Sequence, residues 1–379
     1  MTVRVVLAGG GTSGHVLPAL AVAESLRELG VPNENILYIG ARRGVETKLV
    51  PEAGVRLETF DVSGLQRSIS PRSVLRNLAF LPRLGRARRG ARRLLREFGA
   101  DVVVSVGGYA SLPAVLAARA EKVPVVVVTY DRRPGRSSEM TARWAAATAA
   151  AFPDTKLPRA RHTGAPVRRA VREVDRRADR DAARARLGVG IDEFFVAVVG
   201  GSLGSGVLND AVVACVRESG GDTGLHFRLV AGDRFVADVR EAMASVIGAS
   251  SGVGCDVVGY ELDMASVYAA ADLLVARGGA GTVAEVAVTG IPAILVPWSG
   301  AADDHQTENV RWLSDQDAAV MLRDETVVAE LSSTIAALRS DAQRRLDIGR
   351  RAHQLGELNR RNEVARLVLD VARGSVGST

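Results

Sequence analysis

Residues 3–15 read VRVVLAGGGTSGH, an apolar run followed at once by a glycine-rich turn. The run Val3–Ala8 has the length and the β-branched composition of a buried strand. Beyond the turn, Leu17–Leu29 carries apolar residues at helical spacing and is followed by Gly30, a helix stop. A strand, a glycine turn and a helix in this order predict a right-handed β-α-β unit of a parallel sheet that is covered on both faces.

The same pattern recurs along the chain and predicts the fold class. Further strands are expected at 36–39, 101–106 and 123–128 and, after a pause over 153–193, at 194–199, 226–231, 257–258, 273–275 and 294–296. Strands that alternate with helices indicate an α/β protein with two Rossmann-like, doubly wound parallel sheets. We expect a first domain over 1–163 and a second over 164–345. Ligands should lie at the carboxyl ends of the strands, in a cleft between the halves.

The composition fits a globular protein of 379 residues and excludes several classes. Apolar residues make up 47% of the chain and charged residues 24%, which is ordinary for folded domains and unlike disordered chains. No apolar run reaches the ~18–20 residues that span a bilayer, and the N-terminus lacks the pattern of a secretory signal. Two cysteines without a Cys-x-x-Cys spacing predict no disulfide framework, so we expect a reducing cytoplasm.

Four glycine-rich turns follow predicted strands. They lie at 9–14, 107–108, 200–204 and 278–281. Such turns let the backbone approach a phosphate, which the N-terminus of the following helix also attracts. None has the G-x-x-x-x-G-K-[ST] spacing of a P-loop, so a P-loop nucleotidase is excluded. The first turn satisfies G-x-G-x-x-G, a pattern that by itself could serve only a tight connection between strand and helix.

The first turn is also compatible with binding of a nicotinamide cofactor. The next strand ends Tyr38-Ile39-Gly40-Ala41 without the acid that usually binds a ribose, but Arg42 and Arg43 suit the extra phosphate of NADP. A two-domain NADP-dependent oxidoreductase is therefore one alternative. After the fourth turn, Thr282 and Glu285 have the spacing of a helix capping box, which is the structural alternative to a role of Glu285 at a ribose.

Taken together, the motifs resemble the MurG family of GT-B glycosyltransferases over nearly the whole chain. Both their order and their spacing fit. They are GGGTSGH at 9–15 with Pro18-Ala19, GGY at 107–109, GAPVR at 164–168, GGSLG at 200–204 with Leu208-Asn209, RGGAGTVAE at 277–285, the run 292–297 and DDHQTEN at 303–309. Because the chain of such enzymes crosses back at its end, the resemblance implies that the helical segment 346–373 packs on the first domain.

The resemblance implies an inverting glycosyltransferase. Members of the family transfer N-acetylglucosamine from UDP-N-acetylglucosamine to a muramyl-pentapeptide on undecaprenyl diphosphate, the step from lipid I to lipid II in peptidoglycan synthesis, with no bound metal or other cofactor. The resemblance places the UDP-sugar donor in the second domain, on Arg168, Ser202, Tyr260, Ala280, Gly281, Thr282, Glu285, Gln306 and Asn309. It places the acceptor diphosphate in the first domain, on Thr12, Ser13, Gly14, Gly108 and Tyr109.

Two residues are candidates for the catalytic base that takes the acceptor proton. His15 directly follows the first glycine turn, and the unperturbed pKa of histidine lies near neutrality. It could instead only hydrogen-bond a diphosphate or the loop backbone. Asp131 stands where family members carry the asparagine of a His-Glu-x-Asn element, since this chain reads VTYD at 128–131. A carboxylate there could supply a different base or reject a charged acceptor group.

Two further departures from the family pattern leave the substrates open. Leu203 replaces a glutamine in the third glycine turn, and His305 replaces the first residue of a glutamine pair. Together with Asp131, these changes would suit a relative from secondary metabolism that acts on another lipid phosphate, as in the assembly of phosphoglycolipid antibiotics. An inactive scaffold that binds a UDP-sugar is a further alternative.

Basic charge is concentrated in one segment of the chain. The net charge is +6, and ten arginines at 67, 72, 76, 83, 86, 88, 89, 92, 93 and 96 have no acid among them. Mixed with apolar residues, this Arg67–Arg96 patch predicts contact with an anionic membrane, and hence a peripheral protein on the cytoplasmic face of the plasma membrane. The alternative is a solvated helix face. No nucleic-acid motif or aromatic platform accompanies the arginines, so no nucleic acid is expected as a partner.

Overall fold

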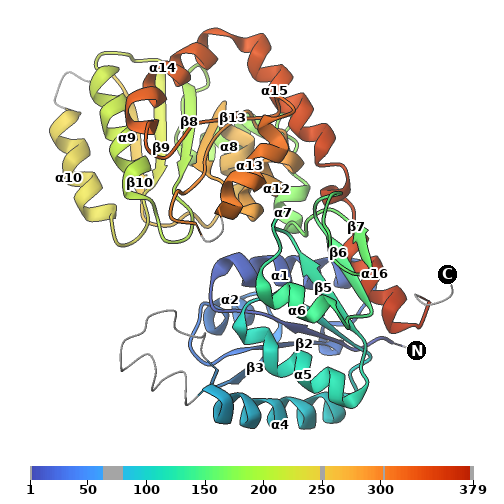
Figure 1. Cartoon of the computed structure of the whole chain (residues 1–379). Helices are drawn as coiled ribbons and strands as arrows, with labels where there is room; N and C mark the ends of the chain where they lie inside the picture. Colours follow the sequence, from blue (N-terminus) through green and yellow to red (C-terminus); the bar gives the residue numbers. More distant parts are fainter. Residues whose placement is uncertain (1, 63–79, 248–251, 302–303, 376–379) are drawn as a thin grey trace. The chain divides into compact units, whose positions relative to one another are not determined.

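The computed structural model describes residues 2–62, 80–247, 252–301 and 304–375 (Figure 1). The chain forms two compact units, each with its own sheet and its own core. The first unit comprises residues 1–169 and the returning segment 361–379, and the second comprises residues 170–360.

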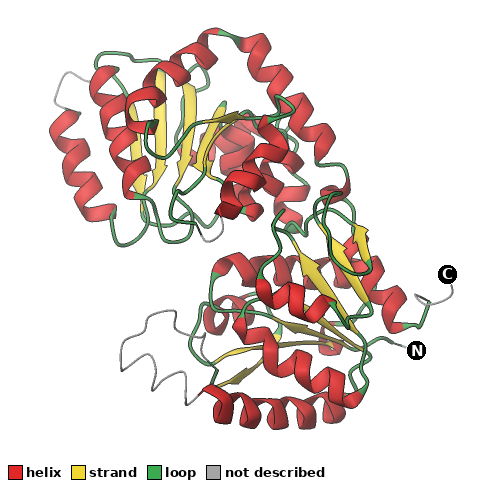
Figure 2. Cartoon of the chain, viewed as in Figure 1, coloured by secondary structure: helices red, strands yellow, loops and turns green. Residues whose placement is uncertain are grey.

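Within the described ranges, the first unit is built on a seven-stranded parallel sheet ordered β3-β2-β1-β4-β5-β6-β7. Its strands are β1 (Val5–Ala8), β2 (Ile36–Ala41), β3 (Arg56–Phe60), β4 (Val102–Ser105), β5 (Val125–Thr129), β6 (Ala147–Ala150) and β7 (Ala160–His162). Every residue of β1, β2, β4 and β5 is buried. Helices lie on both faces of the sheet (Figure 2), which explains why these strands are continuous apolar runs and do not alternate with polar residues.

The helices of the first unit connect its strands and cover its sheet. They are α1 (Ser13–Glu28), α2 (Glu46–Glu52), α4 (Phe80–Phe98), α5 (Leu112–Glu121), α6 (Arg136–Ala142) and the C-terminal α16 (Glu363–Ala372), with short 3-10 turns η1 (Asn33–Asn35) and η2 (Tyr109–Ser111). α4 and α5 pack side by side (Figure 1). Ala91 and Leu95 of α4 join the core with side chains of the central strands.

The described part of the second unit holds a six-stranded parallel sheet ordered β10-β9-β8-β11-β12-β13. Its strands are β8 (Phe194–Val199), β9 (Leu225–Val230), β10 (Gly254–Val258), β11 (Leu273–Arg277), β12 (Ala293–Val296) and β13 (Val320–Met321). Its helices are α8 (Arg180–Leu187), α9 (Gly206–Glu218), α10 (Val236–Val246), α11 (Met264–Ala270), α12 (Ala280–Thr289), α13 (His305–Ser314), α14 (Val327–Ser340), α15 (Ala342–Leu355) and the 3-10 turn η4 (Leu358–Arg360), while α7 (Arg169–Arg172) lies at the boundary. Leu208, Phe227 and Leu229 are among its fully buried core residues.

The end of the chain is divided between the units, which differs from the prediction. α15 stays in the second unit and packs on α12. A Cβ at Gly349 would lie 2.4 Å from the carbonyl oxygen of Gly290, so this close approach requires glycine. α16 alone packs in the first unit, against α1 and β4. The returning segment therefore begins at Arg361 and not at 346, and the first boundary falls after Arg169 and not after 163.

Both sheets have the strand order of a doubly wound Rossmann fold, in which the order reverses at a switch point. The switch point lies between β1 and β4 in the first sheet and between β8 and β11 in the second. The four predicted glycine turns leave these four strands, so each switch point carries two of them. Ligands of such sheets bind at this place. The predicted fold class of two Rossmann-like parallel sheets is confirmed.

Candidate functional site

His15 lies in the first turn of α1, over the second glycine turn of the first unit. A Cβ at Gly107 would be 3.6 Å from Cδ2 of His15, and the imidazole meets the ring of Tyr130 edge-on with 6.2 Å between the centroids. Nδ1 of His15 lies 3.1 Å from Oγ1 of Thr12. The tautomer that donates from Nδ1 to this hydroxyl leaves a lone pair on Nε2.

Burial and two carboxylates set the protonation of His15. Burial lowers the pKa of His15 below its usual value, and the charges of Asp131 and Glu46 oppose this shift without cancelling it. The imidazole is therefore neutral at pH 7 and can accept a proton, as a general base must. Asp131 is half-buried just beyond β5, and its charge acts on His15 more strongly than that of Glu46.

The predicted acceptor residues gather around the two glycine turns of the first unit. They are Thr12, Ser13, Gly14, Gly108 and Tyr109. The first three form the N-cap and the start of α1, where amide N–H groups have no acceptor within the helix and attract anions. The ring of Tyr109 covers the first turn, since a Cβ at Gly11 would lie 3.1 Å from its Cε1. The acceptor residues predicted from two separate motifs, at 9–15 and 107–109, thus lie together at the switch point of the first sheet.

Glu46 is a buried carboxylate that our sequence analysis missed. It begins α2, is fully shielded from solvent, and accepts hydrogen bonds from the N–H groups of Gly11 and Ala41. The signal in the sequence is the pair of glycines at 40 and 44, because a side chain at either position would collide with Glu46.

In the second unit, the fourth glycine turn leads directly into α12. The helix begins at Ala280 with Gly279 as its N-cap, and no side chain caps it. Thr282 and Glu285 therefore do not form the capping box that their spacing permits. Glu285 instead accepts a hydrogen bond from the buried hydroxyl of Tyr268, with 2.6 Å between the oxygens. The carboxylate is thus held beside the first turns of α12 by a neighbouring helix.

α13 brings two more predicted donor residues to this turn. A Cβ at Gly278 would lie 3.0 Å from the carbonyl oxygen of Gln306, so the start of α13 packs against the turn. Oε1 of Gln306 accepts a hydrogen bond from the N–H of Trp298 at 2.9 Å. Asn309 is fully buried, and its side-chain amide donates to the carbonyl of Gly278 at 3.5 Å. Both side chains are therefore fixed by backbone groups near the carboxyl ends of β11 and β12.

The other predicted donor residues are less closely grouped. Ala280, Gly281 and Thr282 form the first turn of α12. Ser202 is exposed in the third glycine turn, beside the fourth because β8 and β11 are neighbours. Tyr260 is exposed beyond the edge strand β10, and Arg168 belongs to the first unit, one residue before the boundary.

A buried ion pair that the sequence did not reveal supports the turns of the second unit. Arg277, at the end of β11, donates to Oδ1 of Asp324 at 2.6 Å and to Oγ of Ser205, the N-cap of α9, at 2.7 Å. Asp324 also accepts from the N–H and the hydroxyl of Ser299. Burial acts to raise the pKa of Asp324, but the hydrogen bonds from Arg277 and Ser299 outweigh it and lower this pKa. These hydrogen bonds thus connect the carboxyl ends of four strands. Ser205 follows β8, Arg277 ends β11, Ser299 follows β12 and Asp324 follows β13.

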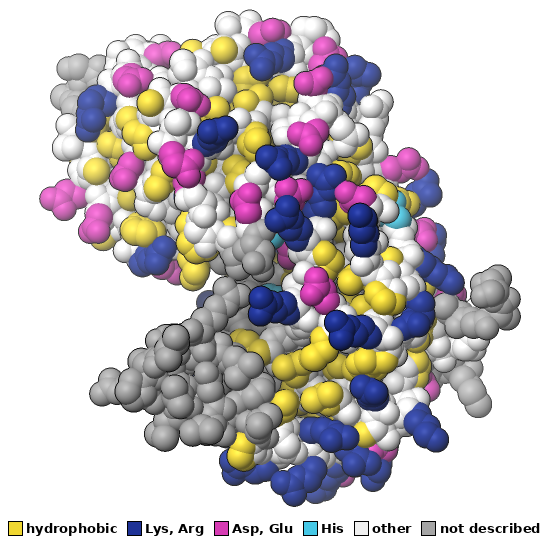
Figure 3. Space-filling model, in the orientation of Figure 1, with side chains coloured by type: hydrophobic (Ala, Val, Ile, Leu, Met, Phe, Trp, Pro, Cys, Tyr) yellow, Lys and Arg dark blue, Asp and Glu magenta, His cyan; other side chains and the backbone are white. Residues whose placement is uncertain are grey.

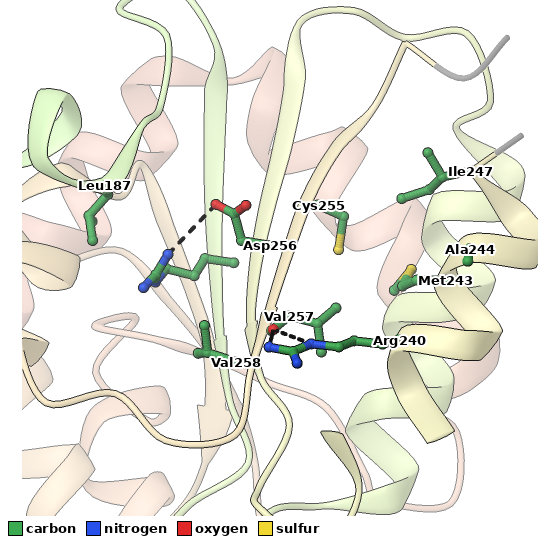
Figure 4. Close-up of a pocket in the computed structure, with 10 residues that line it drawn as sticks. Leu187, Arg240, Met243, Ala244, Ile247, Cys255, Asp256, Val257 and Val258 are labelled. Atoms are coloured by element: carbon green, nitrogen blue, oxygen red, sulfur yellow. Dashed lines mark hydrogen bonds and ion pairs between the residues drawn. The ribbon is translucent and has the colours of Figure 1, made fainter. Parts of the chain in front are cut away.

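The hollow shown in Figure 4 lies away from the switch point, at the outer edge of the second sheet, and is lined by β10, by α10, by Leu187 at the end of α8 and by Arg228 of β9. Arg240 of α10 donates to the carbonyl oxygen of Val257 at 2.8 and 3.1 Å and so covers the edge of β10. Cys255 points from β10 toward Met243 and Ile247 (Figure 4). Burial raises the pKa of this thiol to about 12, so it stays protonated and unreactive. None of the predicted site residues lines this hollow.

In the described part of the chain, no group of three or more His, Cys, Asp or Glu residues is placed to hold a metal ion. Among the described helices, none combines the length and the apolar character that crossing a bilayer requires.

Comparison with known proteins decides the family. Residues 5–150 match the glycosyltransferase family 28 N-terminal domain, and residues 195–364 match the glycosyltransferase family 28 C-terminal domain. A protein of Paenarthrobacter aurescens strain TC1, named UDP-N-acetylglucosamine–N-acetylmuramyl-(pentapeptide) pyrophosphoryl-undecaprenol N-acetylglucosamine transferase, is 40% identical over 370 residues, which cover 97% of this chain and 95% of the relative. The chain belongs to the MurG family of family 28 glycosyltransferases.

A second relative and a solved structure agree with this family. A protein of the same name from Cutibacterium acnes is 43% identical over 302 residues, which cover 78% of each chain. The crystal structure of Acinetobacter baumannii MurG matches with a TM-score of 0.72 at 26% identity and covers 97% of this chain and 99% of that one. The two Rossmann-like units are thus those of a GT-B glycosyltransferase, and the predicted enzyme class is confirmed. The nicotinamide-dependent alternative is abandoned.

Proposed function

We propose that this MurG-family enzyme transfers N-acetylglucosamine from UDP-N-acetylglucosamine to a muramyl-pentapeptide linked to a polyprenyl diphosphate, converting lipid I to lipid II in peptidoglycan synthesis. The names of both relatives describe this transfer for those proteins. The observation that carries the proposal is the chemistry at the switch points. The first has a neutral imidazole, His15, beside a helix N-terminus, and the second has a positioned carboxylate, Glu285, beside another.

The second unit binds the donor in this proposal. The N-terminus of α12 attracts the diphosphate, and Glu285 accepts hydrogen bonds from the ribose hydroxyls. Gln306 and Asn309 lie near the sugar, and the buried Asn309 also holds the turn at Gly278. The full donor set is Ser202, Tyr260, Ala280, Gly281, Thr282, Glu285, Gln306 and Asn309 of the second unit, with Arg168 near the end of the first.

The reaction is a single displacement. The C4 oxygen of the acceptor attacks C1 of the donor sugar, the bond from C1 to the phosphate oxygen breaks, and UDP leaves with the electron pair. The proton of the acceptor hydroxyl passes to Nε2 of His15, and the anomeric centre inverts. Charge that develops on UDP is stabilised by the N-terminus of α12 and by Arg168, so we infer that the transfer needs no bound metal.

A transfer assay tests the proposal. Labelled N-acetylglucosamine is supplied as its UDP donor, together with a short-chain lipid I analogue and a chelator. A labelled disaccharide-lipid is the expected product. No product from a preparation that binds UDP-N-acetylglucosamine tightly would contradict lipid I as the acceptor, and loss of product only in the chelator would contradict metal independence.

Asp131 favours a second candidate acceptor. Its carboxylate lies close enough to His15 to act on the pKa of the imidazole, and it replaces an amide at the predicted acceptor site. A different lipid phosphate, of the phosphoglycolipid antibiotic type, is therefore the competing acceptor. The same assay with a lipid monophosphate acceptor separates the two candidates, and an inactive scaffold would label neither.

We also propose that the arginine patch binds anionic lipid at the cytoplasmic face of the plasma membrane. Lys and Arg side chains gather over α4 in Figure 3. Arg86, Arg88 and Arg89 are exposed there, whereas the intervening Ala87 and the nearby Ala91 are buried. The described part of the patch therefore offers charge to a membrane and keeps these apolar side chains for the core.

Four arginines in the described part of the patch have carboxylate partners, and the longest of these pairs joins Arg83 to Asp61 at 4.0 Å. Arg92 and Arg96 bind Glu121 of α5 at 2.6 and 2.5 Å, and Arg93 binds Glu97 at 2.6 Å. Arg92, Arg93 and Arg96 form the solvated ionic face that was the alternative for the segment. Arg67, Arg72 and Arg76 lie outside the described residues.

A further inference from the structure

Glu46 is a carboxylate buried inside the first unit, directly beneath the first glycine turn. Its side chain has no exposed surface. No Lys or Arg pairs with it in the part of the chain that the structure describes, so backbone groups carry its stabilisation. A carboxylate removed from water needs such hydrogen bonds, because burial without them is costly.

Two segments distant in sequence donate to this carboxylate. The N–H of Gly11 lies 3.0 Å from Oε2 and 3.2 Å from Oε1, and the N–H of Ala41 lies 2.9 Å from Oε1. Gly11 belongs to the turn between β1 and α1, and Ala41 ends β2. Glu46 therefore links the turn that precedes His15 to the adjacent strand of the sheet.

Three glycines make the space that the carboxylate fills. A Cβ would lie 2.2 Å from Oε1 if placed at Gly10, 2.1 Å from Oε2 at Gly44, and 2.8 Å from Cγ at Gly40. A side chain at any of these three positions would therefore force the carboxylate of Glu46 out of its place. Gly10 thus serves an internal anion, although a glycine in this motif usually admits the phosphate of a bound nucleotide.

The position of the carboxylate bears on where a ligand anion can sit. It already holds the N–H of Gly11, and a diphosphate placed over Gly10 and Gly11 would face its negative charge. Among the described residues, the backbone N–H groups that donate to Glu46 are those of Gly11 and Ala41, and not those of the first turn of α1, where Thr12 contacts His15. The N–H of Gly11 thus serves the internal carboxylate, and the N–H groups at the start of α1 are left for an external anion.

We propose that Glu46 is a positioning residue of the acceptor site: its carboxylate fixes the first glycine turn and so sets the placement of Thr12 and His15 toward the acceptor. This role rests on the proposed function for its meaning, because His15 is the base in that proposal. In this proposal Glu46 does not contact the substrate. It acts through the backbone of the first glycine turn, to which it is hydrogen-bonded.

Hydrogen exchange tests the positioning without using the reaction. Amide exchange over residues 9–15 is followed by mass spectrometry in the full chain, in Glu46→Gln, Glu46→Ala and the control Glu52→Gln. Glu52 is an exposed carboxylate on the same helix. We expect exchange about tenfold faster in Glu46→Ala, a smaller increase in Glu46→Gln, whose amide oxygen still accepts one bond, and no change in the control. Unchanged exchange in both Glu46 variants overturns the proposal.

Kinetics with the lipid I analogue give the second readout. In Glu46→Gln we expect kcat/KM for the acceptor to fall about tenfold, while KM for UDP-N-acetylglucosamine stays unchanged. The acid limb of the plot of kcat/KM against pH should move to lower pH, because the loss of the negative charge of Glu46 lowers the pKa of His15. The other titratable groups nearby, Asp131 and Tyr130 beside the imidazole and Tyr109 over Gly11, are kept. A fall in rate with an unmoved acid limb and a raised donor KM would show a merely structural role.

The two experiments separate two kinds of failure. If the wild-type chain gives no product with lipid I, the proposed function fails, and hydrogen exchange still decides whether Glu46 holds the turn. If the wild type is active and the Glu46 variants match it in both exchange and kinetics, the positioning role fails alone.

Discussion

Tyr268 donates a hydrogen bond from its buried hydroxyl to Oε2 of Glu285, with 2.6 Å between the oxygens. The two residues lie on α11 and α12, which flank β11 in the sequence. An ionised carboxylate only accepts hydrogen bonds, and the phenol of Tyr268 supplies one donor to it. Such a carboxylate suits the two donor hydroxyls of a ribose, which is the partner that we propose for Glu285.

Tyr268→Phe should weaken UDP binding about tenfold, because it removes one hydrogen bond to a charged group and leaves the aromatic packing in place. The loss should be smaller for 2′-deoxy-UDP, which offers one hydroxyl fewer to Glu285. Calorimetric titration of both nucleotides measures the difference. Glu285→Ala should abolish the preference for UDP, and the double variant should lose little more than Glu285→Ala, since the two side chains act as one unit. Equal losses for both nucleotides would contradict the ribose contact.

His15→Ala should lower kcat by about 100-fold or more and leave donor binding intact, because a general base contributes on this scale. Since burial lowers the pKa of His15, the wild-type rate should rise with pH through a value below 6.5 and then level off. Asp131→Asn should move this rise in rate to lower pH, since the charge of Asp131 raises the pKa of His15. Initial rates across the pH range measure both effects. Full turnover by His15→Ala would exclude the base role and leave the histidine as a binding group.

Asp324→Ala should destabilise the second unit by about 3–5 kcal/mol, because it leaves the buried guanidinium of Arg277 without its counterion. It should also weaken donor binding, since Arg277 holds the cap of α9. Urea unfolding and calorimetry measure the two effects. Asp347→Ala is the matched control, since it breaks an exposed pair with Arg350 and should change stability little. A similar small change in both variants would show that the buried pair does not support the unit.

Replacing Arg86, Arg88 and Arg89 together by alanine should reduce binding to vesicles of anionic lipid by about fivefold for each charge removed. The matched control is the triple variant of Arg92, Arg93 and Arg96, which have Glu121 and Glu97 as partners. Co-sedimentation at low and high salt measures binding, which should weaken with salt in the wild type. Equal binding by both triple variants would leave the described part of the patch without a role at the membrane.

The pattern of strand, glycine turn and helix was enough to predict two Rossmann-like units and the turns at their switch points. Short strands were missed where local signals are weak. β6 reads ATAA and β13 has two residues, and each forms because a neighbouring strand offers unpaired backbone groups. Thr282 and Glu285 have the spacing of a capping box but do not form one, because α12 already begins at Ala280 and Gly279 is its N-cap.

The sequence by itself therefore determined what depends on neighbours along the chain: the α/β class, the four glycine turns, the position of His15 after the first of them, and the family. The tertiary structure alone decided the contacts that support the site. Glu46 meets Gly11 across 35 positions, and Arg277 meets Asp324 across 47. Which side chains meet across such distances depends on sheet order and helix packing. Local periodicity records that a residue is buried, but it does not record the partner that burial gives it.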